Sequence, residues 1–404
     1  MAEIKAFAGI RPKEGLAQRI AALPYDVYNR QEAKKEVEKE PMSFLRIDRA
    51  ETQLADGTSP YDPAVYQKAH DLLWEMVEKG EFVREEKPCY YLYELTMNGR
   101  SQTGLVACAS IDDYKNNVIK KHENTRADKE QDRICHVDAC NAQTGPIFLA
   151  YRRNPDMDRL VREIKERQTL FSFTSEDEVT HRGWRIDQEH EISMIGEIFG
   201  YIGEIYIADG HHRAASAVAV GEKRRREHPD YSGKEEFNYF LSVLFPGEEL
   251  YIMDYNRVVK DLNGLASKDF LEKVAEKFEV TEIPKAAAPQ KKGCISMYLE
   301  KQWYSLEVKP QFCSDDPVKG LDVSILQQEL LEPVLGIGDP KTDARIDFVG
   351  GIRGLQELER RVQTDCAAAF AMYPTSIEEL FAVADAGLLM PPKSTWFEPK
   401  LRSG

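Results

Sequence analysis

The chain has 404 residues, enough for two or three compact domains, and its 42% hydrophobic and 30% charged residues are typical of a globular protein. The formal net charge of −15 argues against a nucleic-acid binder, because such a protein needs a cationic face to release counterions from phosphates. No apolar run approaches the roughly 18 residues of a membrane helix. The N-terminus lacks a signal-peptide pattern, so we expect a cytoplasmic protein.

The seven cysteines do not indicate a disulfide framework or a zinc ribbon, because no two of them form a Cys-x-x-Cys pair. The densest group of candidate ligands is Cys135, His136, Asp138 and Cys140, and its spacing matches no common structural zinc site. Buried or incidental thiols are the favoured interpretation.

The first hundred residues predict one strong helix and one hairpin. Asp62-Pro63 supplies a cap and a first-turn proline, and Gly80 supplies a stop, which predicts a helix between them. Two strand-like runs at 90–97 and 102–111 flank Asn98-Gly99, a dipeptide that favours a type I′ hairpin turn. Residues 115–138 are dense in charge and show little apolar periodicity.

The rest of the sequence mixes strands and helices without the regular alternation of a Rossmann chain, which predicts an α+β fold. We expect a short helix at 214–220 that ends at Gly221, followed by a solvated basic run at 223–226. The other predicted helices are 157–167, the region of 192–199, 270–278, 323–335, 354–362 and 377–386. The other predicted strands are 146–151, 204–208, 239–245, 250–255, 295–300, 303–308 and 368–372.

The strongest functional pattern is Asp209-Gly210-His211-His212-Arg213, which follows a predicted strand and opens a predicted helix. The first amides of a helix have no partners within it and present a partial positive charge, which favours phosphate. Arginine adds a planar pair of donors, and the histidines add groups that exchange protons near neutral pH. The alternative is a capped helix whose histidines are satisfied by neighbouring groups.

A second pattern, His122-Glu123-Asn124-Thr125, stands in the charged stretch with Arg126 behind it. A carboxylate beside a phosphate site can accept the proton of an attacking hydroxyl group. By itself the dipeptide is more often solvent-facing, and it is not the His-Glu-x-x-His pattern of zinc proteases.

Two further segments are candidates for the edge of a site. Near the C-terminus, Lys393-Ser394-Thr395 follows two prolines and could reach an anion, or could simply strap the tail over the core. Near the N-terminus, Tyr25-Asp26 stands in a proline turn that is either a rigid corner or a site edge. The sequence contains neither of the standard glycine-rich nucleotide loops.

Together these segments, with Pro146-Ile147-Phe148, resemble the family called domain of unknown function ten-fifteen. The central part also resembles the ParB/sulfiredoxin fold, especially its free-serine kinase branch. This resemblance implies a mixed-sheet core at 113–260, interrupted by an insertion at 152–204. An N-terminal α+β region at 1–112 and a C-terminal α+β region at 261–404 would flank it.

The kinase branch implies a role for each matching residue. Glu123 would be the base for a substrate hydroxyl, and Asp209 would lie near a metal ion or the substrate. Gly210, His211, His212 and Arg213 would hold nucleotide phosphates. From the residues themselves we also predict catalytic roles for His122 and Asp209, and phosphate contacts from Thr125 and Arg126. Tyr25, Asp26, Lys393, Ser394 and Thr395 are predicted substrate contacts.

The leading hypothesis is therefore a phosphotransferase that uses ATP or ADP with Mg²⁺ and a small hydroxyl substrate, most simply free serine. The same site could run in reverse from phosphoserine, or pass the phosphoryl group to water as a phosphatase. The alternative hypothesis, from another class of function, is a nucleotide-switched binding protein of the ParB type. We expect no nucleic acid or membrane partner, and a homodimer is left open.

Overall fold

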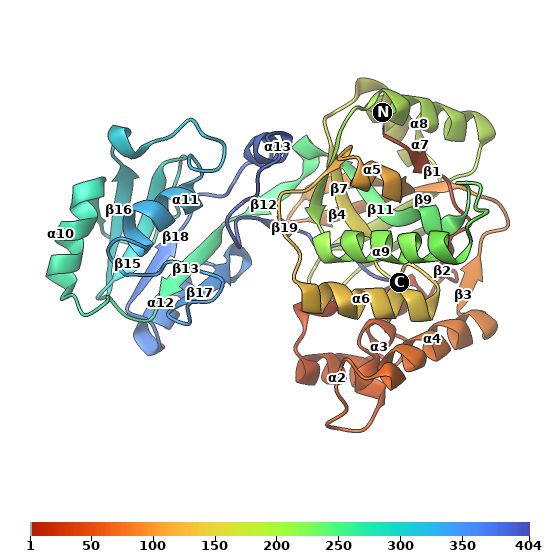
Figure 1. Cartoon of the computed structure of the whole chain (residues 1–404), viewed down its shortest axis with the longest axis horizontal. Coiled ribbons are helices and arrows are strands. Elements are labelled where there is room, and N and C mark those ends of the chain that lie inside the picture. Colours follow the sequence, from red (N-terminus) through yellow and green to blue (C-terminus); the bar gives the residue numbers. More distant parts are fainter. Residues whose placement is uncertain (1) are drawn as a thin grey trace. The chain divides into compact units, whose positions relative to one another are not determined.

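The protein is described here by a computed structural model that covers residues 2–404 and divides the chain into two units (Figure 1). The first unit contains the chain up to residue 250 together with residues 399–404, and the second contains residues 251–398. This division differs from the three predicted regions, 1–112, 113–260 and 261–404. Strands on both sides of residue 112 pair in one sheet of the first unit, so no boundary falls there.

The first unit mixes short and long elements of both kinds. Its helices are α1 (Ala17–Ile20), α2 (Arg30–Lys39), α3 (Leu45–Asp48), α4 (Pro63–Glu78), α5 (Ile111–Lys115), α6 (Ala127–Cys140), α7 (Pro155–Lys165), α8 (Glu189–Tyr201) and α9 (His211–Glu227). Its strands are β1 (Ile4–Lys5), β2 (Ile10–Pro12), β3 (Phe82–Arg84), β4 (Tyr90–Met97), β5 (Arg100–Ser110), β6 (Ile119–Lys120), β7 (Ile147–Tyr151), β8 (Phe171–Thr174), β9 (Thr180–Ile186), β10 (Ile205–Asp209) and β11 (Tyr239–Pro246).

A mixed sheet of nine strands forms the centre of this unit, in the order β6-β10-β7-β11-β5-β4-β9-β8, with β1 paired to β5. The sheet is mixed because β10 runs parallel to β6 but antiparallel to β7. The α+β class with a mixed sheet is thus confirmed. The predicted hairpin is confirmed too, since β4 and β5 pair across Asn98 and Gly99, which both have positive φ. Residues 152–204 supply β8 and β9, which extend the sheet beyond β4.

Two apolar clusters hold the first unit together. The larger one packs helices α7, α8 and α9 on the sheet through fully buried residues such as Ile164, Phe199 and Ala214. The smaller one joins α2, α3 and α4 to the end of α6, where Cys140 is buried. Each large aliphatic or aromatic side chain that is fully buried contributes about 1.5–3 kcal/mol, so these faces fix the position of α9 on the sheet.

Helix α9 is longer than the sequence predicts. It continues through Gly221 to Glu227, and Gly221 is an interior glycine, not a C-cap. A Cβ atom at Gly221 would lie 2.5 Å from the carbonyl oxygen of Phe237, so glycine is required there by close packing. The basic run that follows belongs to the helix and is partly paired, because Lys223 and Arg224 bind Asp138.

Helix α6 covers much of the charged stretch, where the sequence pattern predicts no helix. Its buried side chains are Asp132, Arg133, His136 and Cys140, which are mostly polar. They have partners both elsewhere in the unit and within the helix: the Tyr66 hydroxyl donates to Asp132 at 3.0 Å, and Arg133 pairs with Asp132. A helix with a polar buried face shows no apolar period in the sequence, which explains the missed prediction.

The helices of the second unit are α10 (Ser267–Lys277), α11 (Asp322–Leu326), α12 (Leu355–Thr364) and α13 (Ile377–Asp385). Its strands are β12 (Tyr251–Met253), β13 (Tyr255–Val259), β14 (Phe278–Ile283), β15 (Cys294–Leu299), β16 (Gln302–Val308), β17 (Ile346–Gly350), β18 (Ala368–Ala371) and β19 (Trp396–Glu398).

Six of these strands form one sheet in the order β14-β16-β15-β18-β13-β17, and β12 and β19 pair separately. Two elements differ from the prediction. The strand predicted at 250–255 is split into β12 and β13, and the helix predicted at 323–335 is short and runs into a π-helical turn at Gln327–Leu331.

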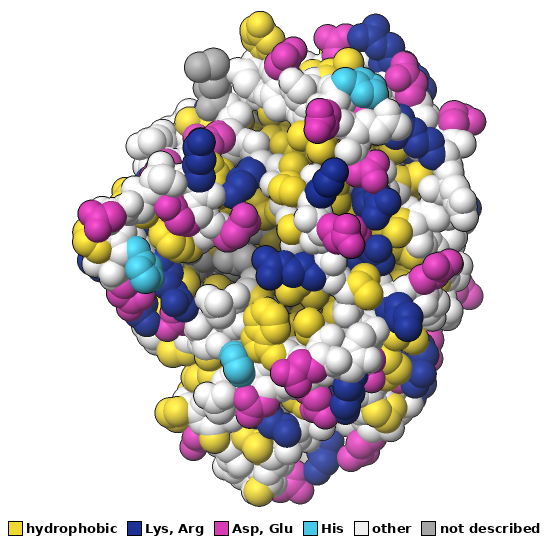
Figure 2. Space-filling model, turned by 90° about the vertical axis from the view of Figure 1, so that its right-hand side faces the viewer, with side chains coloured by type: hydrophobic (Ala, Val, Ile, Leu, Met, Phe, Trp, Pro, Cys, Tyr) yellow, Lys and Arg dark blue, Asp and Glu magenta, His cyan; other side chains and the backbone are white. Residues whose placement is uncertain are grey.

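The surface of the face shown in Figure 2 mixes acidic and basic side chains, and hydrophobic side chains are visible in a hollow near its centre. Among residues 2–404, no helix is both long enough and apolar enough to cross a membrane.

Buried histidines make the stability of the first unit depend on pH. Burial, reinforced by the charge of Arg133, lowers the pKa of His136 to about 3. Its stabilising contribution is therefore complete above the unfolded-state pKa of about 6.5 and is lost as the pH falls from there through about 3. His136→Gln, which keeps a donor for the Ile47 carbonyl, should reduce the slope of unfolding free energy against pH between 6 and 4 by about 1.4 kcal/mol per pH unit.

Urea denaturation at a series of pH values measures this slope. The control is the same substitution at the exposed His190, which should leave the slope as it is in the parent protein. An unchanged slope in His136→Gln would contradict the assignment of His136 as a histidine that is buried without its charge.

Candidate active site

The turn between β10 and α9 depends on glycine. Gly210 is the N-cap residue of α9 and has φ 93°, in the left-handed region that favours glycine. A Cβ atom there would also lie 3.1 Å from both Nε and Nη2 of Arg213. The glycine thus lets the chain turn sharply and lets a guanidinium group lie against the start of the helix.

The first amides of α9 are available to a ligand. Among residues 2–404, no acceptor is found for the backbone N–H groups of His211, His212 and Arg213, whereas Gly210 donates to Asp209 Oδ1 at 2.7 Å. Amide groups left open at the start of a 17-residue helix carry a partial positive charge. This end of α9 is therefore suited to an anion.

Two glycines leave room for the Arg213 side chain beside these amides. Its Nη1 donates to the Pro146 carbonyl at 2.6 Å. A Cβ atom at Gly145 would lie 3.5 Å from the same Nη1, so the guanidinium lies between Gly145 and Gly210. Its Nε and Nη2 atoms have no hydrogen-bond partner in the described part of the chain, and they form the planar pair of donors that matches an oxyanion.

The Glu123 segment, residues 122–126, is attached to the start of α9 at both of its ends. The rings of His122 and His211 meet edge to face with centroids 4.5 Å apart. Four residues later, the backbone N–H of Arg126 donates to Nε2 of His212 at 3.0 Å. Glu123 lies between these two contacts and is exposed. The structure therefore brings together the two motifs that the sequence predicts to act together.

The three histidines of this site are neutral at pH 7. Burial lowers the pKa of His122 to about 4, and burial together with the neighbouring His122 lowers the pKa of His211 well below its usual value. Burial also lowers the pKa of His212. Because His212 accepts through Nε2, its proton is on Nδ1. The three histidine rings thus hold the Glu123 segment in place. The backbone amides of residues 211–213 are the groups that remain available to bind a ligand.

Asp209 is paired with a residue that the predictions did not include. Lys400 Nζ lies 3.0 Å from Asp209 Oδ2. Burial raises the pKa of Asp209, but the charges of Lys400 and Arg213 outweigh it, and the pKa is held well below its usual value. Within residues 2–404, no cluster of three His, Cys, Asp or Glu side chains is arranged to hold a metal ion.

Tyr25 and Asp26 lie at the edge of the same site, as part of a single-turn helix at Tyr25–Val27. Tyr25, Arg133 and Arg213 help to line a polar cavity of about 20 Å³, which is room for about one water molecule. The Arg133 guanidinium stacks 4.1 Å from the centre of the Tyr25 ring, and burial raises the pKa of Tyr25 to about 12. Asp26 is close enough to act electrostatically on His212.

The remaining predicted site residues make local contacts. Thr125 donates to Glu130 at 2.6 Å, and Arg126 pairs with Asp128 at 3.0 Å.

The C-terminal candidates belong to the second unit. The carbonyl of Lys393 accepts a hydrogen bond from Arg257, the Ser394 hydroxyl donates to the Pro391 carbonyl, and Thr395 follows them. Their role in substrate binding stays a prediction.

Comparison with protein families shows to which family the chain belongs. The family described as "Protein of unknown function (DUF1015)" matches residues 4–324. The chain belongs to this family. The predicted resemblance is thus confirmed, although Lys393-Ser394-Thr395 lies beyond the matched range of this DUF1015 protein. Among curated protein sequences, none matches it significantly.

Solved structures similar to the DUF1015 protein share little sequence with it. A free serine kinase in complex with AMP is 16% identical, with a TM-score of 0.36 over 73% of this chain and 86% of that chain. SbnI with a C-terminal truncation from Staphylococcus aureus is 12% identical, with a TM-score of 0.37 over 72% and 82%. A conserved hypothetical protein from Pyrococcus furiosus is 15% identical, with a TM-score of 0.34 over 74% and 93%. Likenesses of this size leave the activity to be argued from the site itself.

Proposed function

We propose that this protein is a phosphotransferase that binds nucleotide phosphates at the start of α9 and transfers a phosphoryl group to a small hydroxyl substrate, most simply free serine. The observation that carries the proposal is the attachment of the Glu123 segment to an anion-binding helix start through two histidine contacts. Phosphoryl transfer requires positioning and charge stabilisation more than covalent chemistry, and these are the properties of this site.

In the proposed reaction, the amides of His211, His212 and Arg213 and the Arg213 guanidinium bind the phosphate oxygens of ATP or ADP. The Glu123 carboxylate accepts the proton of the substrate hydroxyl as its oxygen attacks the terminal phosphorus atom. The new O–P bond forms while the bond to the bridging oxygen breaks, and the shortened nucleotide leaves with that electron pair. The exposed Glu123 is reachable by a substrate from solution.

A magnesium ion fits this site only as a companion of the nucleotide. Asp209 is the predicted ligand, but its oxygens are already engaged by Lys400 and by the Gly210 amide. Mg²⁺ commonly keeps several waters and binds through one or two carboxylates together with substrate phosphates. When bound, the ion would neutralise phosphate charge; the chain's own contribution is the positive charge of Arg213 and the α9 amides.

Phosphorus NMR tests the proposal directly. The protein is mixed with ATP or ADP, Mg²⁺ and serine, and the expected new resonance is that of phosphoserine. Phosphoserine given alone tests hydrolysis, since release of inorganic phosphate without nucleotide would indicate a phosphatase. Tight nucleotide binding with no product from any small hydroxy compound would reject the transferase and favour a nucleotide-switched binding protein.

Arg213→Ala should weaken nucleotide binding. A hydrogen bond to a charged group contributes about 1.5–3 kcal/mol, so the dissociation constant for ADP should rise about 10- to 100-fold by isothermal titration calorimetry. Arg226→Ala on the last turn of the same helix removes the same charge far from the site and should leave the affinity unchanged. Equal affinities of Arg213→Ala and the parent protein would remove Arg213 from the site.

A further inference from the structure

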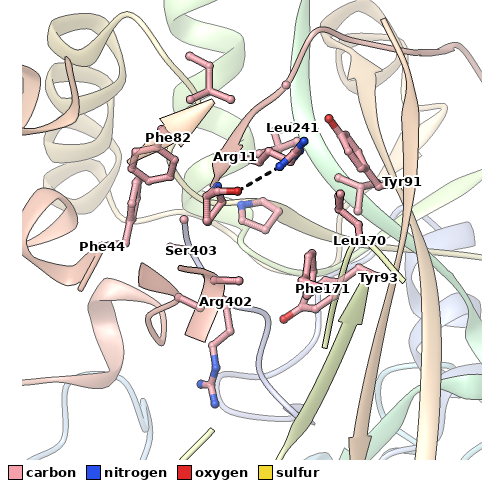
Figure 3. Close-up of a pocket in the computed structure, with 18 of the residues that line it drawn as sticks. Arg11, Phe44, Phe82, Tyr91, Tyr93, Leu170, Phe171, Leu241, Arg402 and Ser403 are labelled. Atoms are coloured by element: carbon pink, nitrogen blue, oxygen red, sulfur yellow. Dashed lines mark hydrogen bonds between the residues drawn. The ribbon is translucent and has the colours of Figure 1, made fainter. Parts of the chain in front are cut away.

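A larger cavity of about 230 Å³ lies elsewhere in the first unit, beneath the sheet face formed by β4, β5 and β11 (Figure 3). Its lining is mostly apolar and includes the aromatic side chains of Phe44, Phe82, Tyr91, Tyr93 and Phe171. An apolar cavity of about 150 Å³ is large enough for benzene, so this one has room for a bicyclic ring. Flat aromatic walls favour a flat ligand, because rings pack edge to face or offset on one another.

Two polar groups in this lining lack a proper partner, the Tyr91 hydroxyl and Nη1 of Arg402. The Tyr91 hydroxyl is buried and, apart from the weakly accepting Cys89 thiol beside it, has no hydrogen-bond partner among residues 2–404. Burial raises the pKa of Tyr91, so the hydroxyl keeps its proton and can donate. The neighbouring Tyr93 differs, because its hydroxyl is bonded to Nδ1 of His181 at 2.8 Å. Buried hydroxyls are normally satisfied, so the open donor of Tyr91 points to an acceptor supplied by a ligand.

The polar surroundings of Tyr91 carry little net charge. The Arg11 guanidinium, which Figure 3 shows beside the Tyr91 ring, is bound through Nε to Glu85 at 2.6 Å and through Nη1 to the Pro12 carbonyl. The Arg402 side chain runs away from the cavity in the same view, and its charge is balanced by Asp177, which binds Nη2, although its Nη1 has no hydrogen-bond partner among residues 2–404. A neutral ligand therefore suits this cavity better than a multiply charged one.

We propose that this cavity binds a planar, neutral, bicyclic aromatic ring whose edge carries a hydrogen-bond acceptor for the Tyr91 hydroxyl. The cavity shares Gln143, Thr144 and Ser403 with the small polar cavity that Arg213 lines. The ring therefore has two sources, the base of the nucleotide of the proposed function or a separate small aromatic molecule. Only the first source rests on the proposed function.

Quinoline and naphthalene test the ring and its acceptor separately, because they have the same shape and differ in one ring nitrogen. In the parent protein quinoline should bind about fivefold more tightly than naphthalene, as expected for one hydrogen bond. Tyr91→Phe should make the two affinities equal. The matched control is Tyr93→Phe, which removes a hydroxyl that already has a partner and should keep the fivefold difference.

Substitutions that fill the cavity test whether quinoline binds inside it. Leu241→Trp and Val106→Phe each enlarge a lining residue, and either variant that keeps the parent circular dichroism spectrum should lose at least tenfold in quinoline affinity. Equal binding of quinoline and naphthalene to the parent protein, or undiminished binding in both folded filled variants, would overturn the proposal.

Competition identifies the source of the ring. If ADP displaces quinoline while pyrophosphate does not, the ring site serves the nucleotide. If neither displaces it, the ring belongs to a separate molecule, and the cavity is an independent binding site. Because quinoline binding requires no phosphoryl transfer, a failure of the proposed activity leaves this test intact.

Discussion

Replacing Glu123 by glutamine should lower the turnover of serine by about 10²- to 10⁴-fold, the usual contribution of a general base. The amide is nearly the same size as the carboxylate but cannot accept the proton of the attacking hydroxyl. The dissociation constant for ADP should stay within about twofold of the parent value, because the α9 amides and Arg213 are untouched. Phosphorus NMR rates together with calorimetry separate the two effects.

A matched control is available at the start of α8. Glu189→Gln removes a carboxylate at the exposed start of α8 and should change neither turnover nor affinity. Full activity in Glu123→Gln would show that the base is another residue. A parallel loss of nucleotide affinity would instead assign Glu123 to binding.

Gly221→Val should lower the unfolding free energy of the first unit by about 3 kcal/mol, the upper part of the range for overpacking a well-packed site. The new Cβ atom would lie 2.5 Å from the Phe237 carbonyl oxygen and 2.7 Å from Cδ1 of Ile111. A backbone carbonyl cannot move aside as a flexible side chain can. Helix α9 would have to shift, and the amides at its start, which we propose to bind phosphate, would shift with it.

Gly196→Val provides the comparison, because Gly196 is also a helical glycine but a Cβ atom added there would meet nothing within 4 Å apart from its own turn of the helix. Urea unfolding should place Gly196→Val within about 0.5 kcal/mol of the parent protein, since valine is a slightly better helix former than glycine. If the two variants lose the same stability, tight packing is not the reason for the glycine at 221.

Those parts of the candidate site that lie close together in the sequence could be predicted from it. A strand, a glycine and a helix start follow one another within residues 204–213, so the open amides and their anion preference are readable from the order of residues alone. The partner of Asp209 could not be read in this way, because Lys400 is 191 residues away and no local pattern marks it. The same holds for Gly145, whose role is apparent only from its distance to Arg213.

The helices and strands that bury apolar side chains could be predicted from the sequence. The hairpin of β4 and β5 and the capped helix α4 have clear turn residues and a clear apolar period. Helix α6 buries Asp132, Arg133 and His136, so its pattern resembles an exposed loop. Gly221 resembles a helix stop, yet tertiary packing against Phe237 places it inside a helix.

The proposed mechanism requires that the first amides of α9 and the Arg213 guanidinium bind phosphate oxygens. A crystal structure of the protein grown with ADP and Mg²⁺ would show whether they do. We expect phosphate oxygens within hydrogen-bond distance of the amide nitrogens of residues 211–213 and of Arg213 Nε or Nη2. An ADP molecule bound at another place, with the start of α9 in contact with water alone, would contradict it.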